Sequence, residues 1–254
     1  MSADNTKQPD KPQSDRVFAT PKSRIEDFNF GKETSEVFDD MLDRSVPYYT
    51  EIQRMTGELA ADFAMPGTQV YDLGCSTCNT FINIERYLPE KLDVKFVGID
   101  ASAEMLKKAR QKLATMGFNY PYELQCSDLD KGVNIINASV VTMMLTLQFI
   151  RPLYRTRLIE SIRRGLVGNG CLILVEKVLG ENSTLNRLFI KYYYDMKRRN
   201  GYSDMEIAQK REALENVLVP YRLEENKQML SDAGFKNVEV FFKWYNFCGM
   251  IALN

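Results

Sequence analysis

The sequence predicts an α/β fold with a mostly parallel sheet of seven strands, the last of them antiparallel. The first observation is that short apolar, β-branched runs alternate with segments of helical spacing between residues 70 and 176. This alternation is typical of strand–helix–strand units with right-handed crossovers. The second is the run Ala138–Leu145, whose residues are mainly apolar, as suits a central strand buried on both faces.

Two helices are expected before the first strand, and strands and helices then alternate as far as residue 176. Apolar residues recur at helical spacing over residues 34–63, and Pro47 interrupts them, which predicts two helices that meet at Ser45–Tyr49. Ser102 is expected to cap a helix, and Gly168-Asn-Gly170 is expected to stop one. Strands are predicted over Val70–Leu73, Lys95–Ile99, Tyr122–Cys126, Ala138–Leu145 and Cys171–Glu176, with helices over 79–88, 102–116 and 152–166 between them.

The rest of the chain completes the sheet. A helical insertion is predicted over residues 183–218, and a further helix over Glu224–Gly234. Two edge strands, Val238–Phe242 and Phe247–Leu253, are expected to close the sheet as an antiparallel pair.

One domain with a tail is expected. Residues 1–23 contain three prolines and many polar residues without periodicity, which predicts a mobile tail. Residues 24–254 are expected to form a single ligand-binding domain. Its helices over 34–63 and 183–218 are predicted to cover the ligand site as a cap.

Composition limits the classes of partner. The chain has 254 residues, 44% of them hydrophobic, and a formal net charge of -1, so it can bury a large core. The balanced charge favours a small-molecule substrate over direct nucleic-acid binding. A polar N-terminal segment and the lack of a long apolar run predict no membrane association. Five cysteines without a signal peptide favour a reducing, cytoplasmic location.

The chain contains no histidine. This excludes Ser-His-Asp and Cys-His catalysis, and any metal site that needs a histidine ligand. Cys75-Ser-Thr-Cys78 has the spacing of redox pairs and zinc knuckles, but no second Cys-x-x-Cys exists to complete a tetrahedral site. We interpret the two cysteines as small side chains in a turn and expect no metal.

Gly74 and Asp100 each follow a predicted strand and suggest a Rossmann-like nucleoside site. A glycine at that position allows the backbone to turn and to approach a ligand closely. A carboxylate at the end of the next strand can accept hydrogen bonds from two ribose hydroxyls. One glycine and one acid suffice for an adenosyl ligand that has no pyrophosphate.

Two further segments have alternative interpretations. The aromatic and cationic residues of Tyr192–Tyr202 and Gln209–Arg211 suit RNA stacking and phosphate contact, or a solvated helical face ending at Asn200-Gly201. A third interpretation treats Arg211 as a fork that binds a substrate carboxylate. Phe149, in the segment Thr146–Phe149 after the central strand, is expected either to line a pocket or to pack in the core.

Together these residues resemble the bacterial carboxy-S-adenosyl-L-methionine synthases, a family formerly regarded as tRNA methyltransferases. The similarity extends from about Arg16 to the end of the chain. The matching strings are Arg44-Ser-Val-Pro47 with Tyr49, Val70-Tyr-Asp-Leu-Gly-Cys-Ser76, Ala138-Ser139, Thr146-Leu-Gln-Phe149, Glu176-Lys177, Lys197-Arg198, Asn200-Gly-Tyr-Ser203, Gln209-Lys-Arg211, Leu214-Glu-Asn-Val217 and Asn246-Phe247.

The resemblance implies a homodimer of class I methyltransferase fold that converts S-adenosylmethionine and prephenate to carboxy-S-adenosylmethionine and phenylpyruvate. A second enzyme of such organisms uses the product to carboxymethylate the wobble uridine of tRNA. In the family's chemistry prephenate releases carbon dioxide and hydroxide, the hydroxide deprotonates the sulfonium methyl, and the ylide captures the carbon dioxide. No protein base is then required, which suits a chain without histidine.

The resemblance also implies roles for individual residues. By this likeness Tyr49 contacts the cofactor, Gly74, Cys75 and Ser76 form its turn, and Asp100 holds the ribose. Either Ser127-Asp128 or Asp128-Leu129 flanks the adenine, and Arg211 pairs with the new carboxylate. An arginine committed to that carboxylate would favour the carboxylated ligand over S-adenosylmethionine, because the latter leaves the guanidinium unpaired.

The chain departs from the family pattern at three places. The turn continues as Thr77-Cys78-Asn79-Thr80, where the family has a second glycine. Met144 stands where the family has an asparagine that contacts the cofactor, and Ala101 stands where an asparagine usually follows the ribose acid. Two alternatives to synthase activity therefore remain: a methyltransferase acting on a small molecule or tRNA, and a non-catalytic protein that binds an adenosyl ligand.

Overall fold

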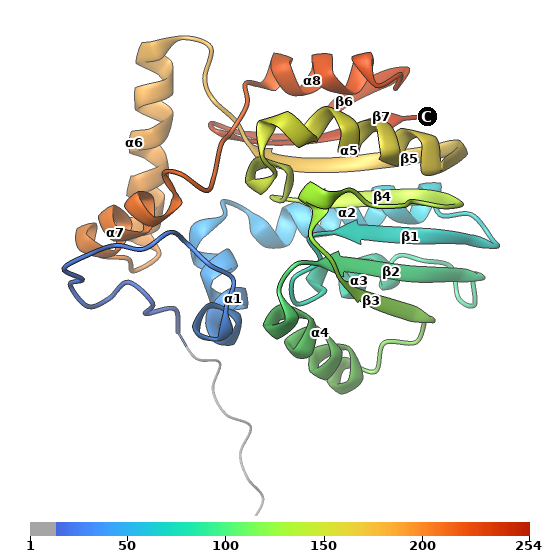
Figure 1. Ribbon diagram of the computed structural model, residues 1–254, viewed down its shortest axis with the longest axis horizontal. Coiled ribbons are helices and arrows are strands. Elements are labelled where there is room, and N and C mark those ends of the chain that lie inside the picture. The colour runs from blue at the N-terminus through green and yellow to red at the C-terminus, as the bar shows by residue number, and fades with distance from the viewer. Residues whose placement is uncertain (1–13) are drawn as a thin grey trace, which may run out of the picture.

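The protein forms a seven-stranded sheet with strand order β3-β2-β1-β4-β5-β7-β6 (Figure 1). The structure is a computed structural model that describes residues 14–254. Its strands are β1 (Thr68–Leu73), β2 (Val94–Asp100), β3 (Tyr122–Cys126), β4 (Ala138–Met144), β5 (Leu166–Lys177), β6 (Asn237–Trp244) and β7 (Phe247–Leu253). Its helices are α1 (Lys32–Ser45), α2 (Tyr49–Phe63), α3 (Asn79–Glu85), α4 (Ala103–Met116), α5 (Pro152–Gly165), α6 (Ser183–Arg199), α7 (Asp204–Leu214) and α8 (Leu223–Asp232).

Helices cover both faces of the sheet, as the strand–helix alternation predicts. Strands β1 to β5 pair in parallel, and successive side chains of each strand enter opposite cores. Val141 and Met143 of β4 pack with α5 and α8 on one face, while Val140 packs with α2, α3 and α4 on the other. Ser102 caps α4 as expected, because its hydroxyl accepts a hydrogen bond from the Met105 amide at 3.2 Å. None of the described helices is long and apolar enough to span a bilayer.

The prediction that the last two strands both lie at the edge is wrong for β7. Strand β7 lies between β5 and β6 and is antiparallel to both, so of these last two strands only β6 lies at an edge of the sheet. The sequences explain this placement. Strand β7 is almost wholly apolar and buried, whereas Asn237–Trp244 alternates polar and apolar residues and is half exposed.

The prediction that Gly168-Asn-Gly170 ends a helix is also wrong. Helix α5 ends at Gly165, and β5 already begins at Leu166. The pairing with β4 moves from Ala138↔Leu166 to Val140↔Cys171, so the intervening residues of β5 form a bulge. A side chain at Gly170 would lie 3.0 Å from the Ser139 carbonyl oxygen, which explains why glycine suits the bulge.

A mobile tail is expected over residues 1–23. The part of it that the structure describes, residues 14–23, is instead in contact with the rest of the domain. Residues 1–13 of that tail lie outside the described residues. Beyond them, Asp15 is only 2% exposed and accepts a hydrogen bond from the Tyr202 hydroxyl. The Gln209 amide donates to the Phe18 carbonyl oxygen at 2.8 Å. Partners almost two hundred residues away therefore hold this segment, and local composition does not reveal them.

Helices α1, α6 and α7 lie together at one end of the sheet (Figure 1). Arg44 at the end of α1 joins them: its Nε donates to the Asn200 carbonyl oxygen at 2.9 Å, and its guanidinium stacks 4.0 Å from the centre of the Tyr202 ring. Gly201, with φ +87°, ends α6 as predicted. We call these three helices the cap, and they stand over the carboxyl ends of the parallel strands, whereas α2 of the expected cap packs against the sheet.

Candidate active site

A cavity of about 670 Å³ lies between the carboxyl edge of the sheet and the cap. Its volume is within the range of pockets that hold a drug-sized ligand. Every site residue predicted from the sequence lines this cavity, namely Tyr49, Gly74, Cys75, Ser76, Asp100, Ala101, Asp128, Leu129, Met144 and Arg211. The topology explains the convergence, because parallel strands β1, β2 and β4 all end at this edge.

The turn after β1 has the backbone geometry expected of a glycine site. Gly74 has φ +77°, and a Cβ there would lie 2.3 Å from the Thr146 Oγ1 atom. The close neighbour is thus a protein side chain from the segment after β4, rather than only a ligand. Ser76 and Cys78 also have positive φ, 47° and 61°, so the turn is tight throughout.

Asp100 joins the ends of β1 and β2. Its Oδ2 accepts from the Ser76 amide at 2.9 Å and its Oδ1 accepts from the Ser102 amide at 2.8 Å. Burial nevertheless raises the pKa of this carboxyl above its ordinary value. The two amides fix the carboxylate at the cavity wall, where its remaining lone pairs face the cavity and can accept from hydroxyl groups.

The turn that lacks the second glycine is held by polar side chains that the sequence did not reveal. Asp39 of α1 accepts from the Thr77 hydroxyl at 2.8 Å and from the Asn79 amide at 3.0 Å, and Lys112 of α4 contacts both Asp39 and Asn79. Asn79 also donates to the Tyr49 hydroxyl at 3.2 Å. The departure from the family pattern therefore comes with its own support, which also positions Tyr49.

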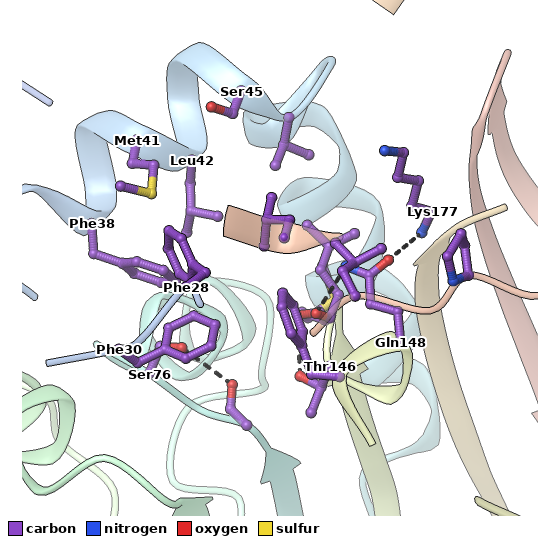
Figure 2. A pocket seen from close by; sticks show the side chains of 18 of the residues that line it. Phe28, Phe30, Phe38, Met41, Leu42, Ser45, Ser76, Thr146, Gln148 and Lys177 are labelled. Atoms are coloured by element: carbon purple, nitrogen blue, oxygen red, sulfur yellow. Dashed lines mark hydrogen bonds between the residues drawn. The ribbon is translucent and has the colours of Figure 1, made fainter. Parts of the chain in front are cut away.

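Aromatic side chains line the cavity beside the ends of β2 and β3. The Phe30 ring lies edge-on to Phe28 and Phe38, with ring centres 5.1 and 6.1 Å away (Figure 2). It also lies edge-on to Phe149, whose ring centre is 5.3 Å away. Phe149 therefore belongs to the pocket, one of its two expected roles. Phe28 and Phe30 belong to an irregular segment without periodicity, so no local pattern predicts that they line the pocket.

Ala101 and Met144, the two other departures from the family pattern, both line the cavity. Ala101 is exposed to the cavity, and the Met144 sulfur lies 3.7 Å from the Thr56 hydroxyl that donates to it. Met144 thus presents a thioether to the cavity, and its sulfur already accepts a hydrogen bond within the protein.

The structure supports the turn interpretation of Cys75 and Cys78. Both are buried, and the Cys78 amide donates to the Cys75 carbonyl oxygen at 2.7 Å. Within residues 14–254 no group of three or more His, Cys, Asp or Glu side chains could hold a metal ion.

A basic wall, consisting of Lys177, Lys197, Lys210 and Arg211, closes the other end of the cavity. The hypothesis of a solvated helical face is wrong for two of these residues, since Lys197 and Lys210 are only 4% and 6% exposed. Only Arg211 lies at an exposed rim, and no carboxylate pairs with it in the described part of the chain. Of this wall the sequence predicts only Arg211. The burial of Lys210 depends on Asp15, which lies far away in the sequence.

Glu176 positions the segment after β4. Its two carboxylate oxygens accept from the Leu147 and Gln148 amides at 2.9 and 2.8 Å. The Gln148 side chain in turn accepts from the Lys177 amide at 3.0 Å and lies beside Lys177 in Figure 2. This network fixes the loop that contacts Gly74, so it couples β5 to the glycine turn.

Two buried carboxyls predict a pH dependence of stability. Burial raises the pKa of Asp72 to about 7 and that of Glu176 to about 8. The folded protein therefore binds more protons than the unfolded chain above about pH 5, and the free energy of unfolding should fall as the pH rises from about 5 to 7. Above pH 7 the lowered pKa of Lys197, about 7, acts in the opposite direction.

Urea unfolding at several pH values between about 5 and 7 tests this dependence. Glu176→Gln and Asp72→Asn should each flatten the slope, by up to about 1.4 kcal/mol per pH unit. Slopes equal to that of the wild type in both variants would contradict the assignment.

The comparisons with known proteins agree with this geometry. Residues 70–170 match the model of the family described as "Methyltransferase domain". Among solved structures, a SAM-dependent methyltransferase from Aquifex aeolicus has a TM-score of 0.58 at 17% identity, covering 89% of this chain and 99% of its own. A putative O-methyltransferase from Nostoc punctiforme has a TM-score of 0.62 at 15% identity, covering 87% of this chain and 59% of its own. These likenesses establish the Rossmann-like class I methyltransferase fold.

Closer relatives are carboxy-S-adenosyl-L-methionine synthases. The protein of that name from Methylococcus capsulatus is 56% identical over 239 residues, which are 94% of this chain and 98% of the relative. Those from Desulfotalea psychrophila and Actinobacillus pleuropneumoniae are 42% and 41% identical, with 95% and 94% of this chain covered and 97% and 98% of the relatives. The chain therefore belongs to the carboxy-S-adenosyl-L-methionine synthase family.

Proposed function

We propose that the protein converts S-adenosyl-L-methionine and prephenate to carboxy-S-adenosyl-L-methionine and phenylpyruvate. Membership of the synthase family along nearly the whole chain carries this proposal. The cavity supports it, because a carboxylate stands at one end and a basic wall at the other. An adenosyl ligand and an anionic second substrate need those two environments.

The adenosyl ligand fits the end of the cavity near β1, β2 and β3. Asp100 is fixed to accept from the ribose hydroxyls, and the apolar surface of Leu129 and Phe30 suits the adenine ring. Tyr49 faces the turn that would hold the methionyl part. These residues bind and orient the ligand, which supplies the methyl group.

The reaction balances without a base from the protein. Prephenate loses one carboxylate as carbon dioxide and its ring hydroxyl as hydroxide, and its ring becomes aromatic. The sulfonium methyl gives a proton to the hydroxide and gains the carbon dioxide, so water is the third product. This suits a chain that contains no histidine. The role of the protein is to hold the two substrates together and to exclude bulk water.

The product is proposed to supply the carboxymethylation of tRNA wobble uridine by a second enzyme. We further propose a cytoplasmic homodimer that binds no nucleic acid and no metal. The formal net charge of -1 supports the absence of direct tRNA binding.

Mass spectrometry after incubation of the purified protein with S-adenosylmethionine and prephenate tests the function. Carboxy-S-adenosylmethionine and phenylpyruvate should form in equal amounts. S-adenosylhomocysteine formed only when a methyl acceptor is added would instead identify a methyltransferase. Ligand binding without turnover of either kind would identify a non-catalytic binding protein.

Arg211→Ala is expected to weaken binding of carboxy-S-adenosylmethionine by at least about tenfold and to leave S-adenosylmethionine binding nearly unchanged. The guanidinium is not paired with a carboxylate in the described residues and lines the cavity, so it can bind the new carboxylate. Arg211→Lys should restore part of the affinity, because it keeps the charge and loses the fork. Calorimetric titrations with equal losses for the two ligands would refute this role.

A further inference from the structure

The basic wall lies at the opposite end of the cavity from the proposed adenosine site. In Figure 2, Lys177 and Gln148 stand on one side of the pocket, while Phe28, Phe30 and Ser76 stand on the other. Lys177 ends β5 and Asp100 ends β2, and the strand order places β1 and β4 between these two strands. Three strand spacings separate them by about 14 Å, so the wall is available to a second molecule.

The amines of the wall are arranged around two tyrosine rings. The Nζ atoms of Lys177 and Lys197 lie 5.1 and 5.2 Å from the centre of the Tyr193 ring. The Nζ atoms of Lys197 and Lys210 lie 5.6 and 5.7 Å from the centre of the Tyr202 ring. Strand β5 and helices α6 and α7 thus direct three cations toward one region of the cavity.

Lys210 is the member of the wall whose charge is balanced within the chain. Its Nζ lies 3.8 Å from the Asp15 carboxylate and donates to the Ser45 hydroxyl at 3.2 Å. Lys177 and Lys197 differ, because within residues 14–254 neither amine has a hydrogen bond or an ion pair. The faces of the tyrosine rings lie against these two amines, and the more distant Asp15 carboxylate also favours the charge of Lys197.

Lys197 is buried and Lys177 is half-buried, and neither amine has a direct counter-ion, so their charges are costly in the ligand-free protein. Burial lowers the pKa of Lys177 to about 8, and burial with the nearby charges of Lys210 and Lys177 lowers that of Lys197 to about 7. An anion placed between the amines would offset this cost, because a buried charge is stable when it is paired. The site therefore has the charge and position to hold a carboxylate.

We infer that Lys177 and Lys197 form the subsite that binds a carboxylate of the second substrate, with Lys210 and Asp15 as its structural support. This inference rests on the proposed function, in which that substrate is the dianion prephenate. It assigns the cap a recognition role that is separate from the role of Arg211 toward the product.

Lys197→Met and Lys177→Met test the subsite, since methionine keeps the length of the side chain and removes its charge. Each variant should bind prephenate about 10- to 100-fold more weakly in calorimetric titrations with S-adenosylhomocysteine present, which lacks the reacting methyl group. S-adenosylmethionine affinity should stay within about twofold of the wild type, and Lys197→Arg should recover part of the prephenate affinity. Lys191→Met, at an exposed position of the same helix α6, is the matched control and should bind both ligands as the wild type does.

Thermal unfolding of the ligand-free protein provides a second measurement. Lys197→Met should melt at the wild-type temperature or above it, because it removes an uncompensated buried charge. A lower melting temperature together with unchanged prephenate affinity would make Lys197 a structural residue and overturn the inference. An equal loss of S-adenosylmethionine affinity would also overturn it, because the lysines would then hold the methionyl carboxylate. Wild-type protein that binds S-adenosylmethionine but no prephenate would instead refute the proposed function itself.

Discussion

Replacing Asp100 with alanine is expected to weaken S-adenosylmethionine binding by at least about two orders of magnitude. The change removes two charge-assisted hydrogen bonds to the ribose, each worth about 1.5–3 kcal/mol, and it also frees the Ser76 and Ser102 amides that the carboxylate holds. Asp100→Asn keeps the shape and loses the charge, so it should show a smaller loss. Calorimetric titration of each variant with S-adenosylmethionine measures the effect.

The matched control is Asp93→Ala. Asp93 is exposed and directly precedes the other end of β2, so its loss changes the charge of the protein equally without touching the cavity. If both alanine variants bind the ligand with the same affinity, Asp100 does not hold the ribose.

Gly74→Ala is expected to lower the free energy of unfolding by about 3 kcal/mol or more. A left-handed backbone costs a non-glycine residue about 1–2 kcal/mol, and the new Cβ would additionally lie within 3 Å of three Thr146 atoms. The displaced turn should also lose S-adenosylmethionine affinity. Urea unfolding and calorimetric titration measure the two effects separately.

Gly117→Ala separates strain from steric overlap. Gly117 has φ +68°, and its added Cβ would meet nothing within 4 Å, so this variant should show only the backbone cost. The double variant Gly74→Ala/Thr146→Ala should recover part of the loss, because it removes the overlapping atoms. Equal destabilisation by the two single glycine substitutions would show that contact with Thr146 is unimportant.

The carboxyl edge of the sheet was predictable because its signals are local. Gly74 and Asp100 each directly follow a recognisable strand, and parallel strands bring such ends together whatever the details of packing. The position of β7 was predictable in principle, since a continuous apolar run next to an alternating one distinguishes an interior strand from an edge strand. The pairing of β5 with β7, in contrast, joins segments some seventy residues apart and leaves no local signal.

The cap was less predictable because its environment is created by distant contacts. Lys197 and Lys210 lie among charged residues typical of a solvated helical face. They are nevertheless buried, because Asp15 packs beside them and bonds to Tyr202 and Lys210. The same holds for Asn79, whose partner Asp39 lies on another helix. Periodicity reports which face of a helix is apolar, and it does not report which polar face another segment will cover.

The interior position of β7 also has a consequence for folding during synthesis. Strand β5 pairs with β4 on one side and with β7 on the other, but residues 247–253 leave the ribosome some seventy residues after β5. During that interval the nascent sheet exposes an unpaired, apolar edge of the kind that promotes aggregation. The parallel half can assemble early, whereas the β5–β7 pairing must wait until residues 247–253 have been synthesised.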